Sequence, residues 1–324
     1  MSSMTRDPAN HSATTEESVG EERELALLEA QHLLELASIE RTQSRYDQAL
    51  RCLQDSLQIF RKYNAPAGVG LALGNIGSVY REQGLFSQAT EVLNEGLDLV
   101  REAGDKRGEG ALLGIFGNIY RAKGDHERAL RLFQEALDIS RLIGNVHTEG
   151  INFGNLGCVY QAQGEYERAK DMHSQALAIS QNYGDAANEG INHGNIGDAL
   201  FGMKRFEEAE KSFRLAIKMG DDSSVMFSGV FRGSLALLLA TQGRLGEAHI
   251  LLNEGKDQVT PYAEEHAKYL VKKGQIRLIG GDIKGARSSL KHAQSIAEEL
   301  KVQDESEVGL AIQRLVDLLN GGQY

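Results

Sequence analysis

A repeat of 40 residues constrains the fold of this chain more than any other feature of its sequence. Four segments that begin at Gly70, Gly110, Gly150 and Gly190 carry glycine at their first, fifth and eighth positions, as in GINFGNLGCVY from Gly150. These spacings of four and three residues place the glycines on one face of a helix. Self-similarity at a fixed period of this length is typical of stacked repeats, in which each unit packs against its neighbours.

Weaker copies of the pattern flank these four segments. The upstream copy aligns through Ala37 and Ser44, and the downstream copies align through Gly243, Gly274 and Gly281. We therefore expect seven repeats within residues 23–303, at approximately 30–69, 70–109, 110–149, 150–189, 190–228, 229–266 and 267–303. Residues 1–22 are predicted to be a disordered tail, because this segment is polar and lacks an apolar run.

Each repeat is predicted to contain two helices. In the fourth repeat we expect the first helix over about 151–162 and the second over about 166–182. Gly164 marks the turn between them and Gly184 the end of the second helix, because glycine just after a helical pattern is a C-cap signal. Gly77 and its equivalents lack a side chain, which predicts close packing of the two helices. The predicted fold class is all-α.

This pattern resembles the tetratricopeptide repeat (TPR), whose motif runs through Leu-Gly, Tyr, a turn glycine and two alanines. In the fourth repeat the motif positions are held by Phe153, Leu156, Gly157, Tyr160, Gly164, Ala169 and Ala176. The family usually repeats at about 34 residues, and the longer repeat here is similar to that of the Leu-Gly-Asn-repeat adaptor proteins and of bacterial TPR proteins. In the fifth repeat Leu200 and Lys204 replace the tyrosine and the turn glycine. The resemblance implies a right-handed superhelix whose first helices line a concave groove for extended peptides or partner helices.

Asparagine recurs two residues before the packing glycine, at Asn75, Asn155 and Asn195, and Ser234 holds this position in the sixth repeat. Asparagine is a mediocre helix former, so its recurrence needs a reason. A side-chain amide both donates and accepts, so it can pair with both groups of a peptide backbone. In the TPR glycosyltransferase that adds N-acetylglucosamine to proteins, asparagines at this position form such a ladder, and the resemblance implies the same role here. The alternative is that they bond only to a neighbouring helix or to water.

A column of glycines precedes the asparagine position, at Gly74, Gly114, Gly154, Gly194 and Gly233. A glycine there leaves helix backbone bare, so either an adjacent helix or a ligand can approach closely. Both interpretations are open from the sequence alone.

A third column holds Arg41, Arg81 and Arg121. Guanidinium groups suit carboxylates, so we expect the N-terminal half of the groove to prefer an acidic segment of a partner. The alternative is a solvated face of charges. The complete set of candidate peptide-binding residues is Asn75, Asn155, Asn195, Arg81, Arg121, Asn118, Gln161 and Ser234.

Composition argues against other classes of function. The net charge of −11 disfavours nucleic acid as a partner, and no apolar run is long enough to cross a bilayer. Cys52 and Cys158 stand far apart without CxxC spacing, which suggests neither a disulfide framework nor a zinc site. No HExxH, GxSxG or phosphate-loop motif occurs. We therefore expect a cytoplasmic protein that is no enzyme and needs no metal or cofactor.

Residues 304–320 form an amphipathic segment with Val308, Ile312, Leu315 and Leu319 on one face. We expect a capping helix, which the end of a solenoid requires; the alternative is a detachable helix that occupies the groove.

The main functional hypothesis is a noncatalytic scaffold or adaptor that binds an extended or helical segment of a partner. The second is a sensory regulator, in which a peptide changes the superhelix shape and controls another protein. Partner identity and oligomeric state stay open.

Overall fold

The computed structural model describes residues 9–321, which form fifteen α-helices and no strand. In chain order these are α1 (Ala9–Thr42), α2 (Tyr46–Lys62), α3 (Pro66–Glu82), α4 (Phe86–Glu102), α5 (Lys106–Ala122), α6 (His126–Leu142), α7 (Val146–Ala162), α8 (Tyr166–Tyr183), α9 (Ala186–Gly202), α10 (Phe206–Ser223), α11 (Val225–Thr241), α12 (Leu245–Val259), α13 (Ala263–Ile279), α14 (Ile283–Leu300) and α15 (Glu307–Leu319). The predicted all-α class is confirmed.

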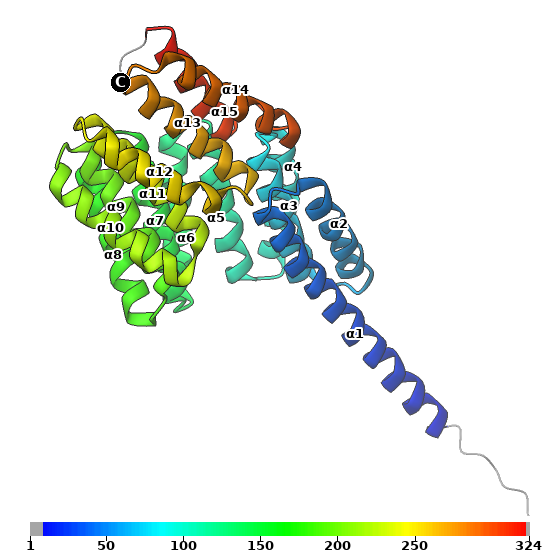
Figure 1. The fold of residues 1–324 in the computed structure, drawn as a ribbon. Helices are drawn as coiled ribbons and strands as arrows, with labels where there is room; N and C mark the ends of the chain where they lie inside the picture. The colour runs from blue at the N-terminus through cyan, green and yellow to red at the C-terminus, as the bar shows by residue number, and fades with distance from the viewer. Residues whose placement is uncertain (1–8, 322–324) are drawn as a thin grey trace, which may run out of the picture.

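Consecutive helices pack in pairs, from α1 with α2 to α13 with α14, and the pairs stack into a right-handed superhelix (Figure 1). The first helices of successive pairs also contact one another, as α3, α5 and α7 do. Each pair begins about four residues before the glycine from which its repeat was counted, as α7 begins at Val146 and not at Gly150. The odd-numbered helices therefore form the inner face of the superhelix and position the candidate site.

A residue in the left-handed conformation follows the first helix of a repeat. Gly84 and Gly164 have φ of 78° and 77°, a conformation that glycine adopts without strain. The fifth repeat keeps the same turn without glycine, because Lys204 has φ of 60° and its N–H donates to the Phe201 carbonyl at 2.9 Å. The departure from the motif at Lys204 thus leaves the repeat geometry unchanged.

Helix α1 begins earlier than the sequence predicts. A disordered tail is expected over residues 1–22, whereas the chain is helical from Ala9; residues 1–8 lie outside the described residues. Once the C-terminal half of α1 is packed against α2, each further residue adds one backbone hydrogen bond without a new nucleation cost, and no proline interrupts residues 9–42. The first turns of α1 extend beyond the helix pairs (Figure 1).

The predicted packing role of the glycine column is confirmed. A Cβ atom on Gly117 would lie 2.7 Å from the Phe133 ring, and one on Gly197 would lie 2.8 Å from the Phe213 ring. The second helices contribute fully buried alanines at equivalent positions, namely Ala89, Ala129, Ala169 and Ala209. Glycine on the first helix lets the aromatic ring of the second helix lie directly on the backbone, and the small alanines of the second helix keep the two helices close.

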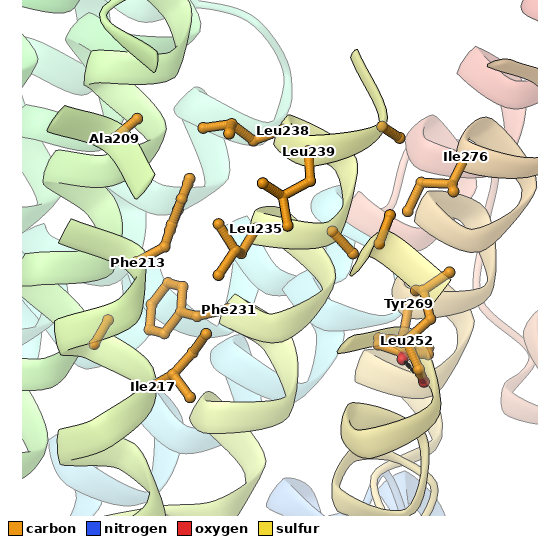
Figure 2. Close-up of a cluster of buried hydrophobic side chains, with 14 of the residues drawn as sticks. Ala209, Phe213, Ile217, Phe231, Leu235, Leu238, Leu239, Leu252, Tyr269 and Ile276 are labelled. Atoms are coloured by element: carbon orange, nitrogen blue, oxygen red, sulfur yellow. Dashed lines mark hydrogen bonds between the residues drawn. The ribbon is translucent and has the colours of Figure 1, made fainter. Parts of the chain in front are cut away.

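The largest part of the core lies between α10, α11, α12 and α13, where aromatic and aliphatic side chains interdigitate (Figure 2). Phe231 belongs to this core, and Phe201, Met203 and Phe227 pack against it. These aromatic and methionine side chains are therefore part of the core and do not form a pocket of the groove. Met226 instead lines a polar cavity at the centre of the superhelix.

Helix α15 packs against the last helix pair. Val308, Ile312 and Leu315 are buried against α13 and α14. The helix starts at a side-chain cap, because the Ser306 Oγ accepts a hydrogen bond from the Gly309 N–H at 3.0 Å. This cap directs Glu307, the first residue of α15, toward the inner face.

Candidate functional site

The predicted asparagine column follows α3, α7 and α9. Asn75 is engaged within its own helix, where its Nδ2 donates to the Leu71 carbonyl at 3.0 Å. Asn155 and Asn195 are half-buried and have no hydrogen-bond partner among the described residues. The column therefore presents two free amides, both in the middle of the solenoid.

The glycine column divides into covered and open members. Gly74, Gly194 and Gly233 are each covered by a side chain of the next repeat. A Cβ atom on Gly114 would meet nothing within 4 Å, and one on Gly154 would meet only the Asn192 Oδ1, at 4.0 Å. Inter-repeat packing accounts for the covered members, whereas helix backbone lies bare at the two open ones.

Gly150 and Gly154 help to open a cavity of about 230 Å³ between α7 and α9. Three helices line this cavity. Helix α7 contributes Gly150, Ile151, Gly154, Asn155 and Cys158, and α9 contributes Asn188, Ile191, Asn192 and Asn195. Helix α8 contributes Ala176, Ile179, Ser180 and Tyr183. We call this cavity the amide slot, because Asn155, Asn192 and Asn195 all present carboxamides to it. Asn192 is only 7% exposed and has no hydrogen-bond partner within residues 20–321.

The equivalent space between α3 and α5 is apolar. Leu112 and Ile115 stand there where Asn192 and Asn195 stand in the amide slot, 80 residues later. The cavity is larger, at about 610 Å³, because it extends to Leu27 on α1 and to Phe60 on α2. One repeat geometry thus carries two different chemistries.

The arginine column faces acidic residues of the chain itself. Glu82 forms ion pairs with Arg41 and with Arg81, the latter at 3.0 Å. Glu307 of α15 reaches Arg121 at 2.9 Å and Arg81 at 3.7 Å. The sequence predicts an acidic segment of a partner for this part of the groove; in the structure, acidic residues of the chain itself pair with these arginines.

Lys268 of α13 joins the same cluster. Its Nζ lies 3.0 Å from Glu264, 2.6 Å from Glu265 and 3.6 Å from Glu307. The Tyr46 hydroxyl donates to Glu264 Oε2 at 2.8 Å. We call the cluster of four cations and four acids the clasp; it comprises Arg41, Arg81, Arg121, Lys268, Glu82, Glu264, Glu265 and Glu307.

Charge pairing in the clasp outweighs burial for its central groups. Burial opposes the charge on Glu307, but the three neighbouring cations are stronger and lower the pKa of its carboxyl to about 2. Burial also opposes the charge on Lys268, yet its three acidic neighbours raise the pKa of the ammonium. Glu82 behaves differently, because burial exceeds the attraction of its arginines and raises the pKa of its carboxyl.

The clasp joins the two ends of the solenoid. It links α1, α3 and α5 to α13 and α15, and backbone contacts reinforce it, since the Gln303 N–H donates to the Gln83 carbonyl at 2.8 Å. Lys301 pairs with Asp47 at 3.0 Å, and Leu300 and Val302 pack on the core of the first two repeats. In Figure 1 the C-terminal helices accordingly lie next to α3 and α4.

Two further predicted residues lie beside the clasp and the slot. Asn118 donates from Nδ2 to the Gly114 carbonyl at 3.2 Å and accepts from the Arg121 guanidinium at 3.4 Å. Gln161 is half-buried at the end of α7 and has no partner in the described part of the chain. The structure thus brings Arg81, Arg121 and Asn118 together and leaves Gln161 apart from them.

Ser234 belongs to a separate polar cluster between α9, α11 and α13. Its Oγ accepts from Lys272 Nζ at 2.8 Å, and it also bonds to Asp198. Burial raises the pKa of the Asp198 carboxyl and lowers the pKa of the Lys272 ammonium. Ser234 is therefore hydrogen-bonded within this cluster, whereas Asn155 and Asn195 have no hydrogen-bond partner among the described residues.

Sequence reasoning missed Glu307, Lys268 and Asn192. Glu307 and Lys268 come from outside the clear repeats, so no periodic signal marks them. Asn192 did carry a signal, because it is an amide at a position where Leu112 and Phe231 stand in other repeats. Asn152 holds the same position in the fourth repeat, so two successive amides in a column that is apolar elsewhere are the pattern that would have found Asn192.

Two other classes of site find no support among residues that the structure describes. Within that part of the chain, no group of three or more His, Cys, Asp or Glu side chains is arranged to hold a metal ion. None of its helices has the length and apolar character needed to cross a membrane.

Comparison with known proteins gives a family and a fold. The family model described as "Tetratricopeptide repeat" matches residues 28–102, 68–142, 109–182 and 148–221. Among curated proteins, none matches the sequence significantly. Three solved structures share the fold at low sequence identity, which shows the fold alone.

The first of these structures is a Rap protein complexed with competence and sporulation factor, with 15% identity, a TM-score of 0.70, and coverage of 85% of this chain and 76% of that one. The second is the Rap conjugation gene regulator of plasmid pLS20 in complex with a peptide, with 17% identity, a TM-score of 0.62, and coverage of 90% and 76%. The third is aspartyl phosphate phosphatase F from Bacillus subtilis, with 14% identity, a TM-score of 0.59, and coverage of 84% and 77%.

Proposed function

Because this chain belongs to the tetratricopeptide repeat family, we propose that it is a noncatalytic adaptor or regulator that binds a segment of a partner protein in its concave groove. The observation that carries the proposal is the pair of free amides, Asn155 and Asn195, beside the open backbone of Gly154. One structural neighbour, the pLS20 regulator, is bound to a peptide, which supports the same use of the fold here.

The free amides suit the backbone of an extended segment. Each carboxamide offers one acceptor and two donors, so it can pair with both the C=O and the N–H of one peptide unit. Such pairing is independent of the partner's side chains. Asn155 and Asn195 lie on neighbouring first helices, α7 and α9, and together they hold a chain that runs across the repeats.

The proposal includes a preference for an acidic segment at the N-terminal end of the groove. There Arg81 and Arg121 are engaged by Glu307, so a partner carboxylate binds by replacing Glu307. Asn118 accepts from Arg121 and keeps its guanidinium in place during this exchange. Gln161 extends the polar surface toward Asn155.

The proposed partner is a protein and not a nucleic acid, because the net charge of −11 repels phosphate backbones. We also propose a cytoplasmic location. Two cysteines that remain free thiols, Cys52 and Cys158, fit a reducing compartment.

The test is selection of peptides from a random phage-displayed library on the immobilised full chain, followed by fluorescence polarisation with the recovered peptides. The combined Asn155→Ala and Asn195→Ala variant should bind at least about tenfold more weakly, since each lost hydrogen bond leaves a partner group unpaired. Asn75→Ala is the matched control, because Asn75 already bonds within its own helix, and it should change affinity less than about twofold. Circular dichroism must show all variants folded. Recovery of no peptide, or equal affinity for the double variant, would contradict the proposal.

The clasp favours a second candidate, a regulator whose shape changes on binding. The ends of the solenoid are joined by polar contacts such as Glu307 with Arg121, and a competing carboxylate can exchange for such a contact. Small-angle scattering with and without a selected peptide separates the candidates. A larger radius of gyration with peptide supports the regulator, and an unchanged profile supports the scaffold.

A further inference from the structure

We propose that the amide slot binds a carboxamide side chain, that of glutamine or asparagine, on the partner segment. The inference rests on the proposed function and adds the side-chain chemistry that the segment must carry at one position. Three properties of the slot lead to it: a buried amide without a partner, a lining that is mostly neutral and has Asp185 as its one acid, and an opening beside the two free amides of the groove.

The unpartnered amide is Asn192. Its side chain is 7% exposed, lines the cavity, and has no hydrogen-bond partner in the described residues. Its Oδ1 points across the slot toward the bare backbone of Gly154. No side chain of the described residues pairs with this amide, so its hydrogen bonds are made by whatever enters the slot, and a ligand carboxamide there would take the place of water.

Packing does not require an amide at this position. The equivalent residue between α3 and α5 is Leu112, which is buried in the apolar core of its repeat. A leucine at position 192 would add apolar contacts and remove the unpaired group. The amide therefore serves the cavity, and the open position of Gly154 keeps room for a ligand in front of it.

The slot favours a neutral group over an ion. No lysine or arginine lines it, whereas Asp185 and His147 do. Asp185 accepts hydrogen bonds from the Asn188 backbone at 3.1 Å and from the Asn188 side chain at 2.7 Å. These bonds lower the pKa of the Asp185 carboxyl, so an anionic ligand would meet a fixed negative charge. Burial raises the pKa of the Cys158 thiol, which keeps it neutral.

A cation uses only the acceptors of the slot: Asp185 already accepts two hydrogen bonds from Asn188, and the amide N–H donors would stay unpaired. A carboxamide matches both, since its oxygen accepts from one asparagine while its NH₂ donates to another or to Asp185. Ile151 and Ile191 border the slot and cover the aliphatic stem of the bound side chain.

The position of the slot connects it to the backbone site. Asn155 and Asn195 line the slot as well as the groove. A residue whose backbone is held by these two amides therefore directs its side chain toward Asn192. This predicts that the selected peptides share glutamine or asparagine at one position.

The experiment uses the best peptide recovered by the full chain and two synthetic derivatives, with the conserved Gln replaced by Met or by Glu. Both should bind at least about tenfold more weakly to the wild type, because Met cannot hydrogen-bond in the same way and Glu brings a charge. If Asn is selected instead, Leu and Asp are the matched replacements.

Two variants of the protein complete the test. Asn192→Leu copies Leu112, so the fold should tolerate it, and it should reverse the preference so that the Met peptide binds more tightly than the Gln peptide. Gly154→Leu fills the slot and should abolish the Gln preference. Gly114→Leu is its matched control at the other open glycine and should retain the preference.

The outcomes separate the two proposals. If no peptide is recovered, the proposed function fails and the inference fails with it. If peptides bind and are lost with the Asn155→Ala and Asn195→Ala variant, but show no Gln or Asn preference and are indifferent to Asn192→Leu, the inference alone is overturned.

Discussion

The third and fourth repeats have the same backbone geometry and differ in the side chains that they bury. Helices α5 and α7 have 17 residues each and carry glycine at the same three positions. The third repeat buries Leu112 and Phe133, whereas the fourth buries Asn152 and His173 at the equivalent positions. Among the described residues, Asn152 Nδ2 and both ring nitrogens of His173 have no hydrogen-bond partner.

The difference shows that glycines, alanines and turns specify the backbone of the repeat. This backbone tolerates polar side chains in the interior, although they pack less favourably than apolar ones. Burial of unpaired polar groups lowers stability, so the fourth repeat is stabilised less by its interior than the third. It is also the repeat that forms one wall of the amide slot. Local departures from the best packing are expected beside functional sites.

The largest predicted effect is a dependence on pH that belongs to the fourth repeat. Burial lowers the pKa of His173 from 6.5 to about 4. Below pH 6.5 the unfolded chain takes up a proton that the folded chain refuses, so the free energy of unfolding falls until about pH 4, by about 3 kcal/mol in total. His173→Phe, which copies Phe133, should remove this part of the decline. Urea unfolding at pH 7 and pH 4.5, followed by circular dichroism, measures it.

The control for this prediction is His249→Gln, because His249 is exposed on α12. It should retain the full decline of the wild type. A His173→Phe variant that loses stability as steeply as the wild type between the two pH values would show that His173 does not act as described.

The next effect concerns an ion pair that the third repeat has and the fourth lacks. Arg121 binds Glu307, whereas the fourth repeat has Gln161 at that position. Glu307→Lys places a fourth cation among three and should lower the free energy of unfolding by about 2 kcal/mol, a modest value because Glu307 is one-third exposed. Thermal unfolding measures the loss.

Hydrogen exchange should also become faster in α5 than in α7 of the Glu307→Lys variant. Glu305→Lys is the control, since it makes the same charge change at an exposed residue without a partner among those described. Equal destabilisation by the two variants would exclude a specific role for the clasp.

In the third repeat, whose Gly114 is open, substitutions in the two glycine columns should change stability in opposite directions. Gly117→Ala places a Cβ atom 2.7 Å from Phe133 and should destabilise by about 1–3 kcal/mol. Gly114→Ala meets open space and should stabilise by up to about 1 kcal/mol. Chemical denaturation of both variants tests this, and the same sign for both would contradict the division of the columns.

The smallest effect is a gain. Asn152→Leu gives the fourth repeat the residue of the third at Leu112 and removes an unpaired buried Nδ2, so it should stabilise by about 1 kcal/mol. Denaturant unfolding at pH 7 measures it. A loss of stability would mean that Asn152 makes a bond on which the fold depends.

The repeat architecture was predictable because its determinants are local. Turn glycines, packing glycines and buried alanines recur every 40 residues, and each acts within its own helix pair. The early start of α1 was not predictable from composition, because it depends on propagation from a packed half of the helix.

The candidate site was predictable only in part. The column from Asn75 to Asn195 was visible in the sequence, but not that Asn75 is engaged while Asn155 and Asn195 are free, since this depends on individual rotamers. The arginines indicated an acidic group, yet Glu307 lies 186 residues beyond Arg121. Contacts of this range leave no periodic trace in a single sequence.

The closure of the solenoid has a consequence for how the chain folds. Helix pairs form from neighbouring residues and require little loop-closure entropy, so they are expected to form early. The clasp joins residues separated by 186 and 218 positions, and such contacts form late. During synthesis the first three repeats emerge well before Glu307. Arg81 and Arg121 therefore spend most of translation without Glu307. The two ends of the solenoid are joined only when the last helix is complete.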